Sequence, residues 1–341
     1  MNINEGTKLT IDYVSIEPKL SLCIPTKNRS TEFNNLLNNV RNQLSLEIEV
    51  VVRDDSDNND TLEIFKKYII GNKFQYQYFQ GSAAGLDRAN LFLLEKARGD
   101  YIWWFGDDDL IINNGIKEVI KLVEDTPDIS FIWANFAQNS LDKLSCNSNS
   151  RFFEDLEDLF LTLGHNLGLL STYILKREDG LKFIHYGYKY IKGFSFVPTA
   201  IVAAMIANNY KAYLLKGPYV LNIPSSIEDL KKMMVKKNSE YQNNAFKTYG
   251  VYYREIVDSQ KHVLSKSGYI KIQKLIFNPV WKGIYVAWLG GWDNPKGKKI
   301  KMLKLYWFLP ECWLALYLFS MPKFFNQYLY KIYKFLFRKV Q

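Results

Sequence analysis

The chain has 341 residues, of which 48% are hydrophobic and 23% are charged, and its formal net charge is +9. These values are typical of a globular protein with one large domain or two of ordinary size, and they exclude an intrinsically disordered chain. The three cysteines, Cys23, Cys146 and Cys312, are odd in number and far apart, which excludes a disulfide framework and a zinc-binding spacing. We expect a cytoplasmic protein, because the polar N-terminus also lacks the apolar segment of a secretory signal.

Strand-like and helix-like patterns alternate along residues 1–135. The expected order is strand 20–24, helix 30–44, strand 47–52, helix 61–70, strand 74–79, helix 87–97, strand 101–105, helix 114–124 and strand 129–134. Strands that alternate with such helices predict an α/β fold with a doubly wound, mainly parallel sheet, as in Rossmann-like proteins. No glycine-rich fingerprint follows the first strand, which argues against a dinucleotide site or a P-loop.

Three consecutive carboxylates, Asp107, Asp108 and Asp109, follow the apolar strand at 101–105. Neighbouring carboxylates repel one another and are costly to remove from water, so a strand end tolerates them best beside a positive group. A divalent cation, Mg2+ or Mn2+, is a good candidate, because such ions take oxygen ligands and are often shared with substrate phosphates. Two ligand sets are open, Asp107 with Asp109 or Asp108 alone, and a solvated acidic turn is the alternative to a metal site.

Two further polar clusters lie at the ends of expected strands, at 25–29 and at 54–56. The carboxyl ends of parallel strands meet at one edge of a doubly wound sheet, and ligands bind in the crevice beyond that edge. We therefore expect these clusters and the acidic triplet to form one binding site.

Four segments in this order resemble family 2 glycosyltransferases of the GT-A fold, and especially their abequosyltransferase-like O-antigen branch. The segments are L-C-I-P-T-K-N-R at 22–29, V-V-R-D-D-S at 51–56, G-L-D-R-A-N at 85–90, and the run from Ala97 through the triplet to Asp109. The resemblance covers residues 19–205. It implies a hexosyl or deoxyhexosyl transferase that moves a sugar from a nucleotide-sugar donor to a lipid-linked bacterial surface glycan of the O-antigen or capsule type, with inversion at the anomeric carbon.

The resemblance also implies roles for single residues. Asp54 would contact the nucleotide base, and Arg88 would pair with diphosphate oxygens, whose geometry a guanidinium matches. The residues expected to bind the nucleotide sugar are Pro25, Thr26, Arg29, Asp54, Asp55, Arg88, Asn90, Asp107 and Asp108, and those expected at the metal are Asp107, Asp108 and Asp109.

Inverting transfer needs a general base for the acceptor hydroxyl. In the family an acidic or histidine-bearing element usually supplies it, but the corresponding segment 194–199 has neither an acid nor a histidine. Glu178 and Asp179 follow a strand-like segment at 171–175 and are the remaining candidates for the base. A solvated turn is the alternative for both.

Positive charge is concentrated in residues 296–341, which carry ten Lys or Arg and one acid, Glu311. A helix over 323–339 would place Lys323, Lys331, Lys334 and Arg338 in one narrow sector beside aromatic and aliphatic residues, a pattern typical of helices that lie in a membrane interface. We expect a GT-A nucleotide-sugar-binding and catalytic domain at 1–220, a helical C-terminal extension at 221–295, and a basic amphipathic tail at 296–341. The tail would bind anionic membranes at the inner face of the cell membrane, and a helix packed on the body of the protein is the alternative.

Two other functions fit parts of the pattern. A nucleic-acid-binding protein would explain the basic, aromatic end but not the acidic strand ends, so we expect no nucleic acid partner. A catalytically inactive scaffold that binds nucleotides would explain why no base is evident.

Overall fold

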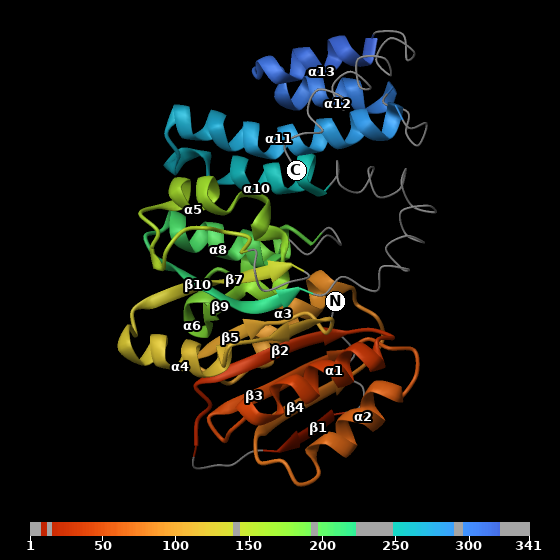
Figure 1. Cartoon of the computed structure of the whole chain (residues 1–341), viewed down its shortest axis with the longest axis vertical. Coiled ribbons are helices and arrows are strands. Elements are labelled where there is room, and N and C mark those ends of the chain that lie inside the picture. Colours follow the sequence, from red (N-terminus) through yellow and green to blue (C-terminus); the bar gives the residue numbers. More distant parts are fainter. Residues whose placement is uncertain are drawn as a thin grey trace, which may run out of the picture. The chain divides into compact units, whose positions relative to one another are not determined.

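The computed structural model describes residues 8–11, 16–138, 144–191, 197–222, 248–289 and 296–320 (Figure 1). The chain divides into two compact units, Met1–Ser225 and Ser226–Gln341. The elements of the first unit are β1 (Lys8–Ile11), β2 (Leu20–Thr26), α1 (Ser30–Val40), η1 (Arg41–Gln43), β3 (Ile48–Asp54), α2 (Asp60–Ile69), β4 (Gln75–Gln80), α3 (Leu86–Lys96), β5 (Tyr101–Trp104), β6 (Asp109–Ile111), α4 (Gly115–Asp125), β7 (Ile129–Gln138), β8 (Arg151–Phe152), α5 (Leu156–Leu163), η2 (Gly164–Gly168), η3 (Leu170–Thr172), β9 (Tyr173–Lys176), α6 (Arg177–Lys182), α7 (Ile184–Lys189), α8 (Val197–Ala207) and β10 (Lys211–Asn222).

One sheet forms the centre of the first unit. Its strands lie in the order β1-β4-β3-β2-β5-β9-β7-β10-β6, and β8 pairs with β10. The strands β4, β3, β2 and β5 are parallel neighbours, as are β7 and β10. The strands β1, β9, β6 and β8 pair with their neighbours in antiparallel orientation. The predicted α/β fold is confirmed, and the sheet is a mixed one built around a parallel core.

Successive residues of β4 show why helices cover both faces of the sheet. Tyr78 stacks on Phe65 of α2, with ring centroids 4.9 Å apart, whereas Phe79 meets Phe92 of α3 at 5.0 Å. Because neighbouring residues of a strand point to opposite faces, α2 and α3 lie on opposite sides of the sheet. This double cover explains why every residue of β2 and β3 is buried.

The order of strand addition reverses between β2 and β5. From β2 the chain adds β3 and then β4 on one side, and it returns to place β5 on the other side of β2. Such a reversal opens a crevice at the carboxyl ends of the two strands, which is the usual ligand site of doubly wound sheets. Thr26 ends β2, and the acidic triplet begins three residues after β5 ends at Trp104. Two of the predicted polar clusters therefore border this crevice.

The strands and helices expected between residues 20 and 125 are all present, with ends that shift by a few residues. The largest local difference is in the first helix, which ends at Val40 and continues as the 3-10 turn η1. No local pattern predicted β6, whose three residues form a strand because Ile111 pairs with Val220 of β10, far along the chain.

The second unit is helical in its described part. Its elements are η4 (Thr248–Tyr253), α10 (Arg254–Ser259), η5 (Lys261–Val263), α11 (Lys266–Leu289), α12 (Lys296–Tyr306) and α13 (Pro310–Ser320). The Tyr306 hydroxyl donates a hydrogen bond to the Gly250 carbonyl at 2.7 Å, and the Arg254 guanidinium lies 4.6 Å from the centre of the Tyr306 ring. These contacts fix the end of α12 against the start of the unit. The expected domain limits at 220 and 295 stay predictions, and the helix expected over 323–339 lies outside the described residues.

Candidate active site

A pocket of about 460 Å³ lies at the carboxyl ends of β2 and β5. The structure brings seven of the predicted residues to its wall, namely Pro25, Thr26, Arg29, Asp55, Asp107, Asp108 and Asp109. The start of α3 adds Gly85, Leu86 and Ala89 to the wall, Leu169 and Leu170 come from the turn before β9, and Asn222 comes from the end of β10. The prediction of one site built from separate strand ends agrees with this arrangement.

Asp107 is a buried carboxylate that faces the end of β2 and the loop that follows it. One of its oxygens accepts a hydrogen bond from the Thr26 hydroxyl at 2.7 Å, and the other accepts from the Arg29 guanidinium at 3.1 Å. The Thr26 bond crosses the switch point between β2 and β5. Burial raises the pKa of Asp107 from its ordinary 3.8 to about 6, although the bonds from Thr26 and Arg29 act in the opposite direction.

Arg29 joins two members of the triplet. The same guanidinium nitrogen that contacts Asp107 also donates to Asp108 at 2.7 Å, and the Arg29 side chain is about half exposed. The backbone before it is held by Asn28, which adopts a left-handed conformation with φ of 55° and exchanges hydrogen bonds with Asp57 through its amide. Asn tolerates this conformation better than most residues, so Asn28 is a positioning residue for Arg29 that our sequence reasoning missed.

Asp109 is directed away from Arg29 and is held by partners distant in sequence. Its oxygens accept hydrogen bonds from the Ser171 hydroxyl and, at 2.7 Å, from the Asn222 amide. The same Ser171 hydroxyl accepts from the Gly106 amide at 2.8 Å. Burial raises the pKa of Asp109 to about 6, against the effect of the bonds from Ser171 and Asn222. Because its oxygens are engaged in this way, Asp109 ties β6 to η3 and β10 at the pocket wall.

A divalent cation fits this donor set if substrate oxygens complete its coordination. Asp107 and Asp108 each direct an oxygen at one guanidinium, so a positive charge already lies between them. Within the described ranges, no group of three or more His, Cys, Asp or Glu side chains is arranged to hold a metal ion. Mg2+ often uses only one or two carboxylates together with substrate phosphates, which is the set that Asp107 and Asp108 supply.

Of the two neighbouring aspartates expected at the nucleotide sugar, Asp55 lines the pocket and Asp54 does not. Asp54, expected at the nucleotide base, is fully buried and accepts hydrogen bonds from the Tyr78 hydroxyl and the Ser56 amide, so it does not reach the pocket. Asp55 does line the pocket, where it pairs with the buried Arg53 at 2.7 Å and accepts from the Ala84 amide at 2.9 Å. The sequence could not distinguish Asp54 from Asp55. Successive residues along a strand point in alternate directions, and the sequence alone did not show which aspartate points into the pocket.

Two residues expected to bind the nucleotide sugar lie near the pocket but not on its wall. Arg88 is partly exposed on α3, and its charge acts on the Tyr188 hydroxyl. Asn90 is fully buried on the same helix, and its side-chain amide atoms have no hydrogen-bond partner among the described residues. Its backbone carbonyl accepts from the Trp104 indole at 3.1 Å.

Glu178 and Asp179 lie at the opposite edge of the sheet, which corrects their assignment as candidates for the base. They follow β9, and β9 is antiparallel to β5, so its end lies beside Tyr101 at the start of β5 rather than beside the triplet. Asp179 is buried there, accepts from the Ser130 hydroxyl at 2.8 Å, and shares Lys182 with the exposed Glu178. The described part of the segment 194–199 has the Thr199 hydroxyl within 2.7 Å of the Tyr173 hydroxyl, inside the core.

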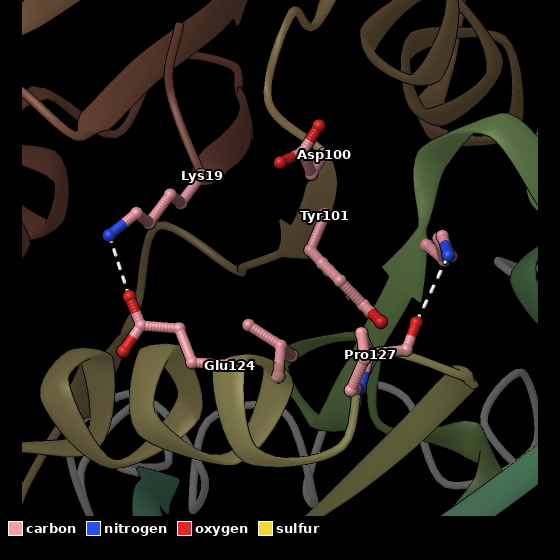
Figure 2. Close-up of a pocket in the computed structure, with 7 residues that line it drawn as sticks. Lys19, Asp100, Tyr101, Glu124 and Pro127 are labelled. Atoms are coloured by element: carbon pink, nitrogen blue, oxygen red, sulfur yellow. Dashed lines mark hydrogen bonds and ion pairs between the residues drawn. The ribbon is translucent and has the colours of Figure 1, made fainter.

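A second pocket, of about 350 Å³, lies at this opposite edge (Figure 2). Lys19 bridges Glu47 and Glu124 there, each at 2.6 Å, and Lys176 donates to the Pro127 carbonyl at 3.0 Å. Its lysines are engaged by the protein itself, and it lies away from the strand-end clusters that meet at the first pocket. The first pocket is the better candidate for an active site.

Cation binding at the first pocket should strengthen as the pH rises through about 6, because Asp107 must lose its proton before it can act as a ligand. A pKa raised above the unfolded value has a second consequence. The free energy of unfolding of the cation-free protein should fall as the pH rises from about 4 to about 6, since the folded state holds the proton more tightly. Mn2+ titrations and urea unfolding across this range measure the two effects, and cation affinity that is flat from pH 5 to 7 (about one unit either side of the raised pKa) contradicts the first.

Comparison with known proteins agrees with this fold. The model of glycosyl transferase family 2 matches residues 21–178. The chain is 32% identical over 113 residues to the abequosyltransferase RfbV of Salmonella typhimurium. The aligned segment covers 32% of this chain and 34% of that protein. It is 23% identical over 113 residues to the GalNAc(5)-diNAcBac-PP-undecaprenol beta-1,3-glucosyltransferase of Campylobacter jejuni, with 30% and 34% covered. The chain thus spans about a third of the length of these curated relatives.

Among solved structures, the fold is similar to that of S. aureus TarS residues 1–349 in complex with UDP. The TM-score is 0.56 at 14% identity, and the alignment covers 83% of this chain and 78% of that one. The family match lies on the sheet and the pocket described above, and its segment includes all three strand-end clusters. The first unit thus has the α/β architecture of the GT-A fold, and residues 21–178 are similar to glycosyl transferase family 2.

Proposed function

We propose that this protein is a cation-dependent, inverting glycosyltransferase that moves a sugar from a nucleotide-sugar donor to a lipid-linked bacterial surface glycan. The observation that carries the proposal is the meeting of Asp107, Asp108 and Arg29 at the switch point of the sheet. Small-molecule sites are commonly concave and several hundred Å³ in volume, so a pocket of about 460 Å³ is large enough for such a donor. Structures of the similar TarS contain UDP and UDP-GlcNAc, which supports a nucleotide sugar as the ligand class.

In the proposed complex, Asp107 and Asp108 would hold the Mg2+ or Mn2+ ion that accompanies the donor diphosphate. Such an ion supplies a Lewis acid that offsets the charge developing on the departing diphosphate. Arg29 moves from the carboxylates to the diphosphate oxygens, which a guanidinium matches in shape and charge. Pro25, Thr26 and Asp55 form the wall against the nucleotide, while Ser171 and Asn222 keep Asp109 and the strand after the triplet in place.

The acceptor side of the proposal rests on charge and on similarity. The similar Campylobacter jejuni enzyme is named for an undecaprenol-linked glycan. Residues 296–341 of this chain are strongly basic. We place the protein in the cytoplasm, peripheral at the inner face of the cell membrane, where a lipid-linked acceptor is within reach. Among the described helices, none has the length and apolar character needed to cross a membrane.

A second candidate is a scaffold that binds nucleotide sugars without turning them over. It is favoured by one observation, since the structure removes Glu178 and Asp179 from the pocket. Among the described residues, the acids on the pocket wall are Asp55 and the triplet. Asp55 is tied to Arg53, and the triplet is engaged by Thr26, Arg29, Ser171 and Asn222.

The test is to incubate the full chain with UDP-, GDP-, dTDP- and CDP-sugars, Mn2+, and a lipid-linked acceptor extracted from bacterial membranes. We expect one donor to release its nucleoside diphosphate only when both cation and acceptor are present. Binding of a donor without release would support the scaffold. If no donor binds with any cation, the proposed function is wrong.

A further inference from the structure

The second unit exposes apolar side chains at an unusual density. Half of the large hydrophobic residues that are exposed in the described structure lie within residues 300–317, namely Ile300, Leu303, Trp307, Trp313, Leu314 and Tyr317, here called the aromatic face. The others are scattered singly, as is normal for a soluble protein surface. Contiguous apolar patches of this kind mark surfaces that meet another molecule.

Helix geometry places these residues on matching sides of two helices. On α12 and the residue that continues its last turn, positions 300, 303 and 307 fall within a single sector when each residue turns 100°, and on α13 positions 313, 314 and 317 do the same. The Trp313 indole donates a hydrogen bond to the Trp307 carbonyl at 2.7 Å, so the two sectors adjoin at the turn between the helices. The side chains remain open, with Trp307 62% exposed, Trp313 55% and Tyr317 61%.

The opposite sides of both helices are already packed. Met302 and Tyr306 of α12, and Cys312, Ala315 and Phe319 of α13, are buried. The core of the second unit therefore uses a separate set of apolar residues, and it does not need the aromatic face for its own stability.

One exposed lysine, Lys304, adjoins the aromatic face, and the helix that carries it is rich in lysine. Helix α12 carries five lysines and no acid in its sequence, Lys296–Tyr306. The one acid of α13, Glu311, is paired with Lys274 of α11 at 3.1 Å. Lys304 is exposed in the same sector of α12 as Trp307, and Lys299 donates to the Phe319 carbonyl at the end of α13. Tryptophan and tyrosine beside lysine are the residues that favour the interface of a bilayer, where aromatic rings lie at the headgroups and ammonium groups meet anionic lipids.

We propose that the aromatic face of α12 and α13 docks on an anionic lipid surface. The biological role of this contact rests on the proposed function. The contact adds to that function a folded surface that would bind the membrane in which the acceptor is held. This contact is distinct from the helix expected over 323–339. A second copy of the chain is a poorer occupant, because a symmetric contact would bring the lysine-rich α12 of one copy against that of the other.

The test compares full-length chains on vesicles of phosphatidylcholine with and without phosphatidylglycerol. Trp307→Ser, Trp313→Ser and Tyr317→Ser are combined in one variant, and Ile70→Ser with Phe152→Ser, two exposed apolar residues of the first unit, serve as the matched control. We expect co-sedimentation with phosphatidylglycerol vesicles to weaken about tenfold or more in the triple variant and to remain unchanged in the control, because inserted apolar area sets the strength of binding. Bromine-labelled acyl chains should quench tryptophan fluorescence of the unmodified protein and lose most of that effect in Trp307→Ser with Trp313→Ser.

Two outcomes would overturn the proposal. One is equal sedimentation and equal quenching of the triple variant and the unmodified protein. The other is a concentration-dependent dimer that the triple variant loses while its vesicle binding is unchanged, which would make the aromatic face a contact between copies. Nucleoside diphosphate binding, measured on the same proteins without vesicles, separates this failure from failure of the proposed function, because the variant positions are outside the pocket.

Discussion

Asp107→Asn and Asp108→Asn should each lower sugar transfer by on the order of 100-fold or more while the chain remains folded. Both side chains are on the pocket wall and share the Arg29 guanidinium, so they are placed to hold a cation against a diphosphate. An amide keeps the shape of the carboxylate but not its charge. Since burial raises the pKa of Asp107 to about 6, its charge is costly in the folded state, and Asp107→Asn should leave the free energy of unfolding unchanged or higher.

Release of nucleoside diphosphate measures the first effect, and thermal unfolding measures the second. Asp125→Asn is the matched control, because Asp125 is an exposed carboxylate at the end of α4. It should leave both quantities unchanged. Normal transfer by Asp107→Asn and Asp108→Asn, or equal transfer by the unmodified protein in EDTA and in Mn2+, would show that transfer does not require a cation.

Arg29→Gln should change cation binding and donor binding in opposite directions. In the absence of donor, the guanidinium occupies Asp107 and Asp108, so its removal should tighten Mn2+ binding. In the presence of the cation, loss of a charge-assisted partner should weaken binding of the nucleoside diphosphate about tenfold. Calorimetric titration of Mn2+ alone, and of the diphosphate in saturating Mn2+, measures the two effects on one preparation.

Arg29→Lys is the companion variant for this prediction. It keeps the positive charge that competes with the cation but loses the planar fork that grips two oxygens. It should therefore resemble the unmodified protein in Mn2+ binding and resemble Arg29→Gln in diphosphate binding. If Arg29→Gln alters neither affinity, the contact with Asp107 and Asp108 is only a surface ion pair.

Local patterns in the sequence were sufficient to predict the parallel core of the fold. Alternating periodicity located β2 to β5 with their helices, because each of these elements has a buried face whose spacing is visible in its own residues. The clusters at 25–29 and 107–109 were predicted to meet, since parallel strands end at the same edge of a sheet. The bond from Thr26 to Asp107 shows that they do meet.

The remaining parts of the site depend on contacts that no local pattern contains. Asn222 reaches Asp109 from the end of β10, and Ser171 reaches it from a short turn before β9. Neither residue lies in a recognisable motif, and only the pairing of β10 with β6 brings Asn222 into place. The prediction that Glu178 or Asp179 supplies the base failed for a related reason. Because β9 is antiparallel to β5, the residues that follow β9 lie beside the start of β5 and not beside its carboxyl end.

A cation-assisted nucleotide-sugar site predicts that the affinity of the full chain for a nucleoside diphosphate, measured by calorimetry, differs between Mn2+ and EDTA. UDP, GDP, dTDP and CDP are each titrated into the unmodified protein and into Asp107→Asn. We predict that one of the four binds tightly in Mn2+, that EDTA weakens this binding about tenfold or more, and that Asp107→Asn binds equally weakly in both conditions. Binding of no nucleotide in either condition, or equal binding in Mn2+ and EDTA by the unmodified protein, would contradict a cation-assisted nucleotide-sugar site at the ends of β2 and β5.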